Sequence, residues 1–276
     1  MFLVTGSSGL LGPYLCDAAA RFGPVTATAR RGPSPCDLIV ASDVEELVGK
    51  TNPEVVIHAA AMTDVDACES NPRAALRSNQ QATANLISAI GSNVSFVYIS
   101  TDQVYPDLAG PHGEGSEAPV NSYGRSKLAG EQEALAHPGA LVLRTNLFGP
   151  SRSEGRQSLS DFVVDNLAND RAINLFRDAL FSPLHMVTLS ELVVELVERK
   201  IFGTYNLGSQ QGLSKADFGI EIARHLGLST ETVSVVNSLG IGGRAPRPLD
   251  LRIDVGLIEE KIGRSLPTLR EEILKL

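Results

Sequence analysis

A tyrosine and a lysine four residues apart carry the strongest chemical signal in the sequence. Tyr123 and Lys127 form a YxxxK pair at the start of a stretch with helical character, and this spacing places both side chains on one face of a helix. With only five tyrosines in 276 residues, chance explains the pair poorly. An ammonium beside a phenol favours phenolate and lowers the pKa of the phenol, so the pair could exchange a proton with a substrate oxygen.

Thr101 is the third residue that we expect to take part in catalysis. It follows a short apolar run and precedes the YxxxK pair in the chain. Parallel sheets bind their ligands at the carboxyl ends of strands, so Thr101 and Tyr123 are predicted to face one pocket. The Thr101 hydroxyl can donate a hydrogen bond to a substrate oxygen whose charge grows during reaction. The alternative is a surface tyrosine beside a salt-bridging lysine.

A glycine-rich turn near the N-terminus predicts a nucleotide site. Gly6, Gly9 and Gly12 have GxxGxxG spacing, with Leu10 and Leu11 between the last two, directly after a strand-like run and before a helical one. Glycines let the backbone turn sharply and approach a pyrophosphate, and the helix start offers free N–H groups. An ordinary glycine turn is the alternative.

Two arginines at the end of the second predicted strand bear on the choice of cofactor. In an NAD site a carboxylate near this place binds the ribose 2'-hydroxyl, but the sequence has Arg30 and Arg31 there. Guanidinium groups pair well with a 2'-phosphate. NADPH is therefore the predicted cofactor. NADH stays open, since a solvated arginine pair would also explain these residues.

Alternating apolar runs and helical stretches indicate the scaffold that positions these groups. This alternation of strands and helices, in which the strands are apolar throughout, is typical of a parallel sheet covered by helices on both faces. We predict an α/β fold: a Rossmann-type doubly wound parallel sheet with a smaller C-terminal substrate lobe. The predicted strands span 2–5, 25–29, 55–58, 96–100 and 141–145. The predicted helices span 10–22, 72–90, a stretch that follows Ser122 and runs to about 136, and 189–200.

The pattern of residue types changes after Pro150, and this change predicts two lobes. Residues 151–160 are polar and contain glycine, and strand and helix alternate irregularly beyond them. Residues 1–150 with about 178–203 are expected to form the cofactor-binding domain. About 151–177 with 204–276 are expected to form the substrate-binding lobe.

Composition limits the partners and the compartment. The net charge of -8, with no dense basic run, disfavours binding to nucleic acid or an anionic membrane. No apolar run approaches the roughly 18 residues that span a bilayer, and no basic leader precedes the glycine turn, so we expect a cytoplasmic protein. Three cysteines without metal-ligand spacing suggest neither disulfides nor a metal site. The oligomeric state is open, a homodimer included.

Further short motifs follow one another along nearly the whole chain. They are TGSSGLLG at 5–12, Asp37-Leu38, His58 to Ala61 followed by Thr63, Val65, Asp66 and Glu69, Ser100-Thr101-Asp102, then Glu114, Pro119, Asn121, Tyr123-Gly124, Lys127 and Gly130-Glu131, and finally Arg144-Thr145 and Arg247-Pro248 with Arg252 and Asp254. In this order they resemble the motifs of the extended short-chain dehydrogenase/reductases, and within that group those of the dTDP-4-dehydrorhamnose reductases.

The resemblance implies roles for residues that spacing alone does not assign. It implies hydride transfer between nicotinamide and a carbonyl or secondary alcohol, with Lys127 also holding the nicotinamide ribose. The implied cofactor contacts beyond the glycine turn and the arginines are Asp37 and Leu38 beside the adenine, Ala59, Ala60, Ala61, Thr63, Ser100, Tyr123 and Lys127. The implied substrate contacts are Val65, Asp102, Gln103, Leu147, Arg247 and Arg252, of which the two arginines could bind a diphosphate or form structural ion pairs.

Two departures from the family pattern concern the sugar. Gln103 stands where an aromatic residue is typical, and the Leu147 region stands where a tryptophan is typical; the chain has no tryptophan. We therefore predict an NADPH-dependent reductase of a keto-sugar nucleotide, with the sugar left open. The alternatives are a sugar-nucleotide epimerase or dehydratase, and a non-catalytic NADP-binding regulatory subunit like that of methionine adenosyltransferase.

Overall fold

A six-stranded parallel sheet forms the centre of the computed structural model, which describes residues 1–30, 34–238 and 243–276. The strands lie in the order β10-β5-β4-β3-β1-β2. Their bounds are β1 (Phe2–Thr5), β2 (Val25–Thr28), β3 (Val55–His58), β4 (Ser95–Thr101), β5 (Ala140–Thr145) and β10 (Gly203–Leu207). The chain winds outward from β1 in both directions, which confirms the predicted Rossmann-type sheet.

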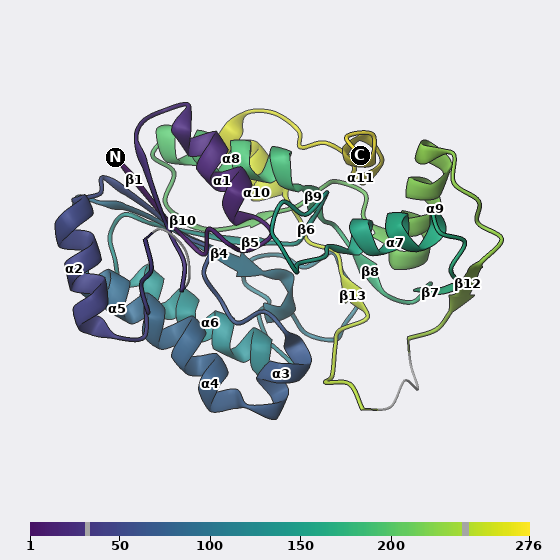
Figure 1. Cartoon of the computed structure of the whole chain (residues 1–276), viewed down its shortest axis with the longest axis horizontal. Helices are drawn as coiled ribbons and strands as arrows, with labels where there is room; N and C mark the ends of the chain where they lie inside the picture. Colours follow the sequence, from purple (N-terminus) through teal and green to yellow (C-terminus); the bar gives the residue numbers. More distant parts are fainter. Residues whose placement is uncertain (31–33, 239–242) are drawn as a thin grey trace.

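Helices cover both faces of this sheet (Figure 1). One face carries α1 (Gly12–Ala20), α8 (Met186–Glu198) and α10 (Gly256–Ile262), and the other carries α2 (Ala41–Thr51), α5 (Ala82–Ala89) and α6 (Ser122–Leu135). Every residue of β5 is buried, as expected for a strand between two helical layers. The continuous apolar runs of the sequence therefore reflect burial on both sides.

The predicted helix over 72–90 is interrupted by a π turn. The structure has α4 (Pro72–Leu76), the π turn η1 (Arg77–Gln81) and then α5, preceded by the short α3 (Val65–Ser70). Asn79, in the π turn, is fully buried. Its Oδ1 accepts from the Met62 amide at 2.7 Å, and its Nδ2 donates to Ser126 Oγ at 2.9 Å. The π turn thus places the Asn79 side chain where it links the loop after β3 to α6.

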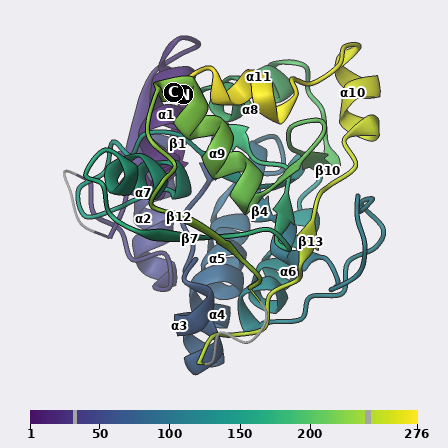
Figure 2. The same cartoon turned by 90° about the vertical axis from the view of Figure 1, so that its right-hand side faces the viewer.

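A smaller group of elements lies beyond one end of the sheet. Figure 1 shows α7 and α9 to the right of the sheet, and Figure 2 views this side directly, with α9, β7 and β12 in front. The group and its connections comprise the 3-10 turn η2 (Asp102–Val104), β6 (Leu147–Phe148), α7 (Leu159–Leu167), β7 (Ile173–Phe176), β8 (Leu180–Phe181), β9 (Leu184–His185), β11 (Leu213–Ser214), α9 (Lys215–Leu226), β12 (Val233–Val236), β13 (Asp250–Leu251) and α11 (Leu269–Ile273).

One segment differs from the expected division into lobes. Residues 204–207 were expected in the substrate lobe, but β10 pairs in parallel with β5, so this stretch is the last strand of the central sheet. A register of five residue pairs joins the two strands. The remaining lobe boundaries stay a prediction. Within the described residues, no helix has the length and apolar character to cross a membrane.

Candidate active site

Thr101, Tyr123 and Lys127 lie together at the end of β4. Thr101 is the last residue of that strand, and the other two belong to the first turns of α6. Asn121 caps this helix by accepting from the Gly124 amide at 2.8 Å. All three side chains are buried. The Thr101 and Tyr123 side chains lie close enough to interact, and their sharing of one substrate pocket stays a prediction.

Two glycines let α6 approach the sheet closely enough to bring these groups together. A Cβ at Gly124 would stand 2.1 Å from the carbonyl oxygen of Gln103. A Cβ at Gly130 would stand 2.1 Å from the Tyr98 hydroxyl and 2.3 Å from the carbonyl oxygen of Asn79. No larger residue fits such approaches without moving backbone. The glycines of the YG and GE motifs therefore fix the distance between helix and strand.

We expected Lys127 to lower the pKa of Tyr123, and the structure does not show this effect. Burial raises the pKa of Tyr123 well above its usual value, and hydrogen bonding to Thr101 opposes this only in part. The Lys127 ammonium instead donates to the Ile99 carbonyl at 2.7 Å and lies 4.0 Å from the Tyr98 ring centroid. Desolvation destabilises phenolate here, so Tyr123 is a neutral phenol at neutral pH.

Lys127 itself is strongly perturbed by burial. Its side chain is 2% exposed, and this burial lowers its pKa to about 7, while the Glu131 carboxylate one helical turn later raises it. Ser100, expected near the cofactor, has its hydroxyl hydrogen-bonded to Glu131. The charge of Lys127 therefore depends on a buried carboxylate that sequence reasoning did not assign to the site.

The glycine turn after β1 is tight, with close approaches between backbone atoms. Gly6 has φ +73°, and its missing Cβ would stand 2.6 Å from the Ala60 nitrogen; at Gly12 a Cβ would stand 2.5 Å from the Gly6 carbonyl oxygen. The Gly9 amide donates to that same oxygen at 2.9 Å. Leu10 is partly exposed and Leu11 is buried. The backbone atoms of the turn approach one another so closely that a Cβ at Gly6 or Gly12 would clash with them, and only glycine avoids this.

The alanine stretch after β3 lies against this turn. Ala59, Ala60 and Ala61 are each partly exposed, and the Ala60 amide donates to Thr5 Oγ1 at 3.4 Å. Thr63 is exposed a little farther on. Small side chains thus line the surface between the carboxyl ends of β1 and β3, where a dinucleotide would need close access to backbone.

The expected cofactor residues after β2 differ from one another in exposure and in hydrogen bonding. Arg30 is exposed, and its only described polar contact is Ser78 Oγ at 3.4 Å. Arg31 lies outside the described residues. Asp37 accepts from the Ile39 amide at 3.1 Å in a local turn. Leu38 is buried, and its carbonyl accepts from Asn85 at 2.9 Å.

Three of four further expected substrate residues lie next to the catalytic group or to the cap of its helix α6. Asp102 is buried next to Thr101, and desolvation raises its pKa to about 6 against the effect of a 2.6 Å hydrogen bond from Asn146. Gln103 accepts from Asn121 at 2.9 Å. Val65 packs against the cluster that contains Tyr123. Leu147 is partly exposed in β6.

The two late arginines already have carboxylate partners. Arg247 binds Asp66 through both terminal nitrogens, at 3.1 and 2.8 Å. Arg252 binds Asp250 through its Nε and Nη2, at 2.9 and 2.6 Å. The ion pairs weighed as an alternative are thus present, and a role of these arginines in binding a diphosphate stays a prediction.

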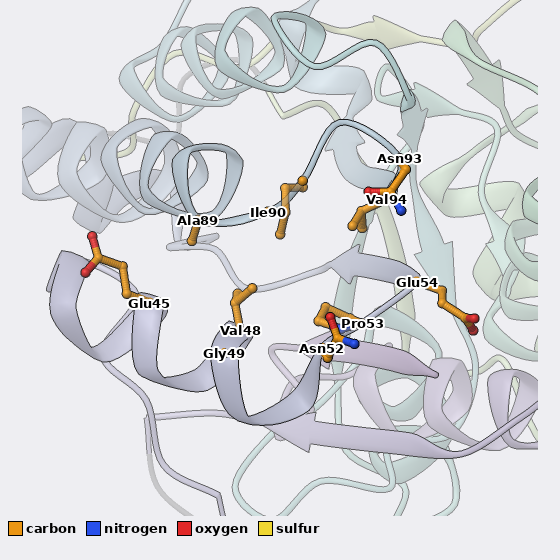
Figure 3. A pocket seen from close by; sticks show the side chains of 11 residues that line it. Glu45, Val48, Gly49, Asn52, Pro53, Glu54, Ala89, Ile90, Asn93 and Val94 are labelled. Carbon is orange, nitrogen blue, oxygen red and sulfur yellow. The ribbon is translucent and has the colours of Figure 1, made fainter.

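A separate hollow of about 570 Å³ lies away from this group, between α2 and the end of α5. Figure 3 shows Glu45 and Val48 of α2 on one side and Ala89 and Ile90 on the other. Its lining includes Pro53 and other residues that precede β3 and β4. Thr101 lies at the opposite, carboxyl end of β4, so this hollow is no part of the candidate active site.

Comparison with known proteins gives consistent similarities. Residues 1–276 match the RmlD substrate binding domain family. The "Probable low-salt glycan biosynthesis reductase Agl14" of Haloferax volcanii is 30% identical, with 99% of this chain and 96% of that protein aligned. The methionine adenosyltransferase 2 subunit beta of Xenopus laevis is 27% identical, with 96% and 84% aligned. The crystal structure of Bacillus anthracis dTDP-4-dehydrorhamnose reductase in complex with NADP has a TM-score of 0.91 at 24% identity, covering 99% and 97%.

Proposed function

The chain belongs to the RmlD substrate binding domain family, which confirms the resemblance inferred from its motifs, and on this premise we propose that it is an NADPH-dependent oxidoreductase that reduces a keto-sugar nucleotide. The observation that carries the proposal is the meeting of Thr101, Tyr123 and Lys127 at the carboxyl end of β4. Its sequence similarity to a glycan biosynthesis reductase supports the same class of reaction.

The site residues have the properties that a carbonyl reduction needs. When bound, NADPH supplies the hydride. Tyr123 donates the proton to the developing alkoxide, and the burial that raises its pKa keeps it in the protonated form that a donor requires. Thr101 donates a hydrogen bond to the same oxygen. Lys127 binds the nicotinamide ribose, the role that the resemblance implies for it.

The described residues fit an NADP-type dinucleotide. The glycine turn, where a Cβ at Gly12 would meet backbone at 2.5 Å, leads into α1. The start of α1 has no side-chain cap, so its N–H groups can bind a pyrophosphate. The partly exposed alanines beside it allow close contact with the ring systems of the cofactor. Arg30 has no carboxylate partner among the described residues, so its guanidinium can pair with the 2'-phosphate.

The sugar is proposed to differ from the rhamnose precursor, or to include it only as a weak substrate. Gln103 and Leu147 offer an amide and an aliphatic side chain where the family pattern has aromatic rings. Loss of a stacked ring removes about 0.5–1.5 kcal/mol beyond its apolar area. An amide adds hydrogen bonding and space. A sugar with an additional polar group suits this pocket better.

A regulatory role is the second candidate, because a relative of similar length is the methionine adenosyltransferase 2 subunit beta. An epimerase or dehydratase has less support, since Gln103 supplies no second carboxylate beside Asp102. Because the chain has all three residues of the catalytic group, Thr101, Tyr123 and Lys127, the reductase is favoured over the regulatory subunit. A regulatory subunit needs NADP binding but neither Thr101 nor Tyr123.

A substrate panel tests the proposal. NADPH oxidation is measured with dTDP- and UDP-linked 4-keto-sugars and with simple ketones, for the natural chain and for Tyr123→Phe. We expect turnover of at least one nucleotide-linked sugar, weak reaction of simple ketones, and loss of turnover in the variant. An inactive natural chain that binds NADPH and co-purifies with an adenosyltransferase would establish the regulatory candidate instead.

A further inference from the structure

The segment 150–153, between β6 and α7, lies against the first turns of α1. The Tyr14 hydroxyl of α1 donates to the Pro150 carbonyl, 136 residues away in the sequence, at 2.7 Å. Nη1 of Arg152 donates to Oδ2 of Asp17 at 2.6 Å, and the Arg152 guanidinium carbon lies 5.0 Å from the Tyr14 ring centroid. A hydrogen bond, an ion pair and a ring contact therefore hold this segment on α1.

Ser153 links the segment to the glycine turn. Its Oγ donates to the Gly9 carbonyl oxygen at 2.8 Å, across 144 residues of sequence. Ser151 fixes Ser153, because the Ser151 Oγ donates to the Ser153 carbonyl at 3.1 Å and accepts from the Ser153 amide at 3.2 Å. The Ser151 amide donates to Asp161 of α7 at 3.0 Å. The smaller group of elements thus holds the Ser153 hydroxyl at the glycine turn.

The hydrogen bond from Ser153 fixes the orientation of the peptide that joins Gly9 to Leu10. This peptide is trans, and in a planar trans peptide the C=O and N–H groups point in opposite directions. A carbonyl held toward Ser153 therefore turns the Leu10 N–H away from the segment. Neither the Leu10 nor the Leu11 amide has an acceptor among the residues that the structure describes, as is usual for N–H groups at the start of a helix.

N–H groups at a helix start bind phosphate when they point toward it. Ordering a flexible backbone at the moment of binding would cost conformational entropy and weaken the affinity. We propose that Ser153 is a positioning residue for the cofactor: by holding the Gly9 carbonyl, it presents the Leu10 N–H to the pyrophosphate of NADPH. Ser153 acts through the backbone and needs no contact with the cofactor. The inference rests on the cofactor of the proposed function and not on its sugar.

Equilibrium binding of two cofactors tests the role of Ser153. The dissociation constants of NADPH and NADH are measured by fluorescence titration for the natural chain and for Ser153→Ala. Loss of one neutral hydrogen bond should weaken both about threefold to tenfold, because both cofactors carry the pyrophosphate. The ratio of the two constants should not change, whereas Arg30→Ala should change it. Unaltered affinity for both cofactors in Ser153→Ala would overturn the proposal.

A conservative variant separates the hydroxyl from the shape of the segment. Ser153→Thr keeps a hydroxyl and should restore most of the affinity for both cofactors. Ser116→Ala is the matched control, because the exposed Ser116 also donates to a glycine carbonyl, that of Gly113, at 2.7 Å in another loop. This control should bind both cofactors like the natural chain. If Ser153→Thr binds them as weakly as Ser153→Ala, the hydroxyl is not responsible and the proposal is wrong.

A fragment of the cofactor separates positioning from a general loss of structure. Adenosine 2'-monophosphate has the adenine and the 2'-phosphate of NADPH but no pyrophosphate. Calorimetry should therefore give the same affinity for this fragment in Ser153→Ala and in the natural chain, while NADPH binds the variant more weakly. Equal weakening of the fragment and of NADPH would assign Ser153 to the scaffold and overturn the proposal.

The outcomes distinguish this inference from the proposed function. If a keto-sugar nucleotide is reduced, Ser153→Ala should raise KM for NADPH and keep kcat at saturating NADPH, because Thr101 and Tyr123 are unchanged. If that sugar is reduced and Ser153→Ala binds both cofactors like the natural chain, the reductase stands and the positioning role is wrong. If Ser153→Ala weakens both cofactors but no keto-sugar is reduced, the positioning role stands and the reductase is wrong.

Discussion

Arg144 and Glu131 form a buried ion pair behind the candidate active site, with Nη2 of Arg144 2.7 Å from Oε2 of Glu131. Their side chains are 3% and 1% exposed. Arg144 belongs to β5 and Glu131 to α6, so the pair joins the sheet to the helix that carries Tyr123 and Lys127. Glu131 also raises the pKa of Lys127. One carboxylate therefore serves both the scaffold and the charge of the lysine.

The first prediction concerns the pH dependence of cofactor binding in Glu131→Gln. Burial lowers the pKa of Lys127 to about 7, and the Glu131 charge raises it, so removing that charge lowers the pKa further. The ammonium is then lost at a lower pH, and the alkaline fall in NADPH affinity should begin at a lower pH than in the natural chain. Fluorescence titration between pH 6 and 9 measures this. An unchanged midpoint in a folded variant would show that Glu131 does not control Lys127.

The second prediction concerns stability. Arg144→Met leaves the Glu131 charge buried without its partner and should cost about 3–5 kcal/mol in the free energy of unfolding. Urea unfolding measures this, and the double variant with Glu131→Met should regain most of the loss. Lys50→Ala breaks the exposed pair with Glu46 and should have little effect. Equal losses from Arg144→Met and Lys50→Ala would contradict the argument from burial.

The sequence predicts the sheet well because its signals are local. Five strands follow from apolar runs, and the helix predicted to follow Ser122 begins one residue earlier in the structure, at Ser122 itself. The ends of α1 differ from prediction by two residues, as is common for helix boundaries. α2 and α3 are absent from the predicted helices, although Asp43 in the first turn and Lys50 in the last turn of α2 are a detectable helix signal.

The missed parts of the site depend on contacts between distant segments. No local pattern predicts that Lys127 donates to the Ile99 carbonyl, or that Asn79 turns inward within a π turn. The partner of Arg247 likewise becomes visible only in the fold, because Asp66 is 181 residues away, whereas Asp250 lies two residues before Arg252. Residue type and spacing found the reacting groups, whereas their charge states needed the tertiary structure.

The third prediction concerns the glycine turn. A Cβ in Gly12→Ala would stand 2.5 Å from the Gly6 carbonyl oxygen and 2.6 Å from Ser7 backbone atoms, so the turn must open. NADPH binding should be lost and the Tm should fall. Gly113→Ala is the control, because a Cβ there meets nothing within 4 Å. Normal NADPH affinity in Gly12→Ala, measured by fluorescence titration, would place the cofactor elsewhere.

The fourth prediction concerns the proton donor. Tyr123→Phe removes only the hydroxyl of a buried ring, so the fold and NADPH affinity should persist while kcat falls about 10²-fold or more. Lys127→Ala should reduce both kcat and NADPH affinity, because the ammonium that we propose to bind the nicotinamide ribose is lost and the cofactor is held less precisely. Single-turnover rates with a verified substrate measure the first effect. A near-normal kcat in Tyr123→Phe would mean that another group donates the proton.

The last prediction concerns the preference for NADPH over NADH. Arg30 is exposed, and its one polar contact with the residues that the structure describes is long, to Ser78 Oγ at 3.4 Å, so its guanidinium can bind a 2'-phosphate. One charge-assisted interaction contributes about 1.5–3 kcal/mol, which corresponds to a preference of roughly tenfold to a hundredfold. Arg30→Ala should reduce that ratio by weakening NADPH binding while leaving NADH binding unchanged. Arg73→Ala is a control at an exposed arginine of α4. Because the interaction is electrostatic, the ratio should also fall as salt rises from 0.05 to about 0.5 M. Equal dissociation constants for the two cofactors in the natural chain would contradict the assignment of Arg30.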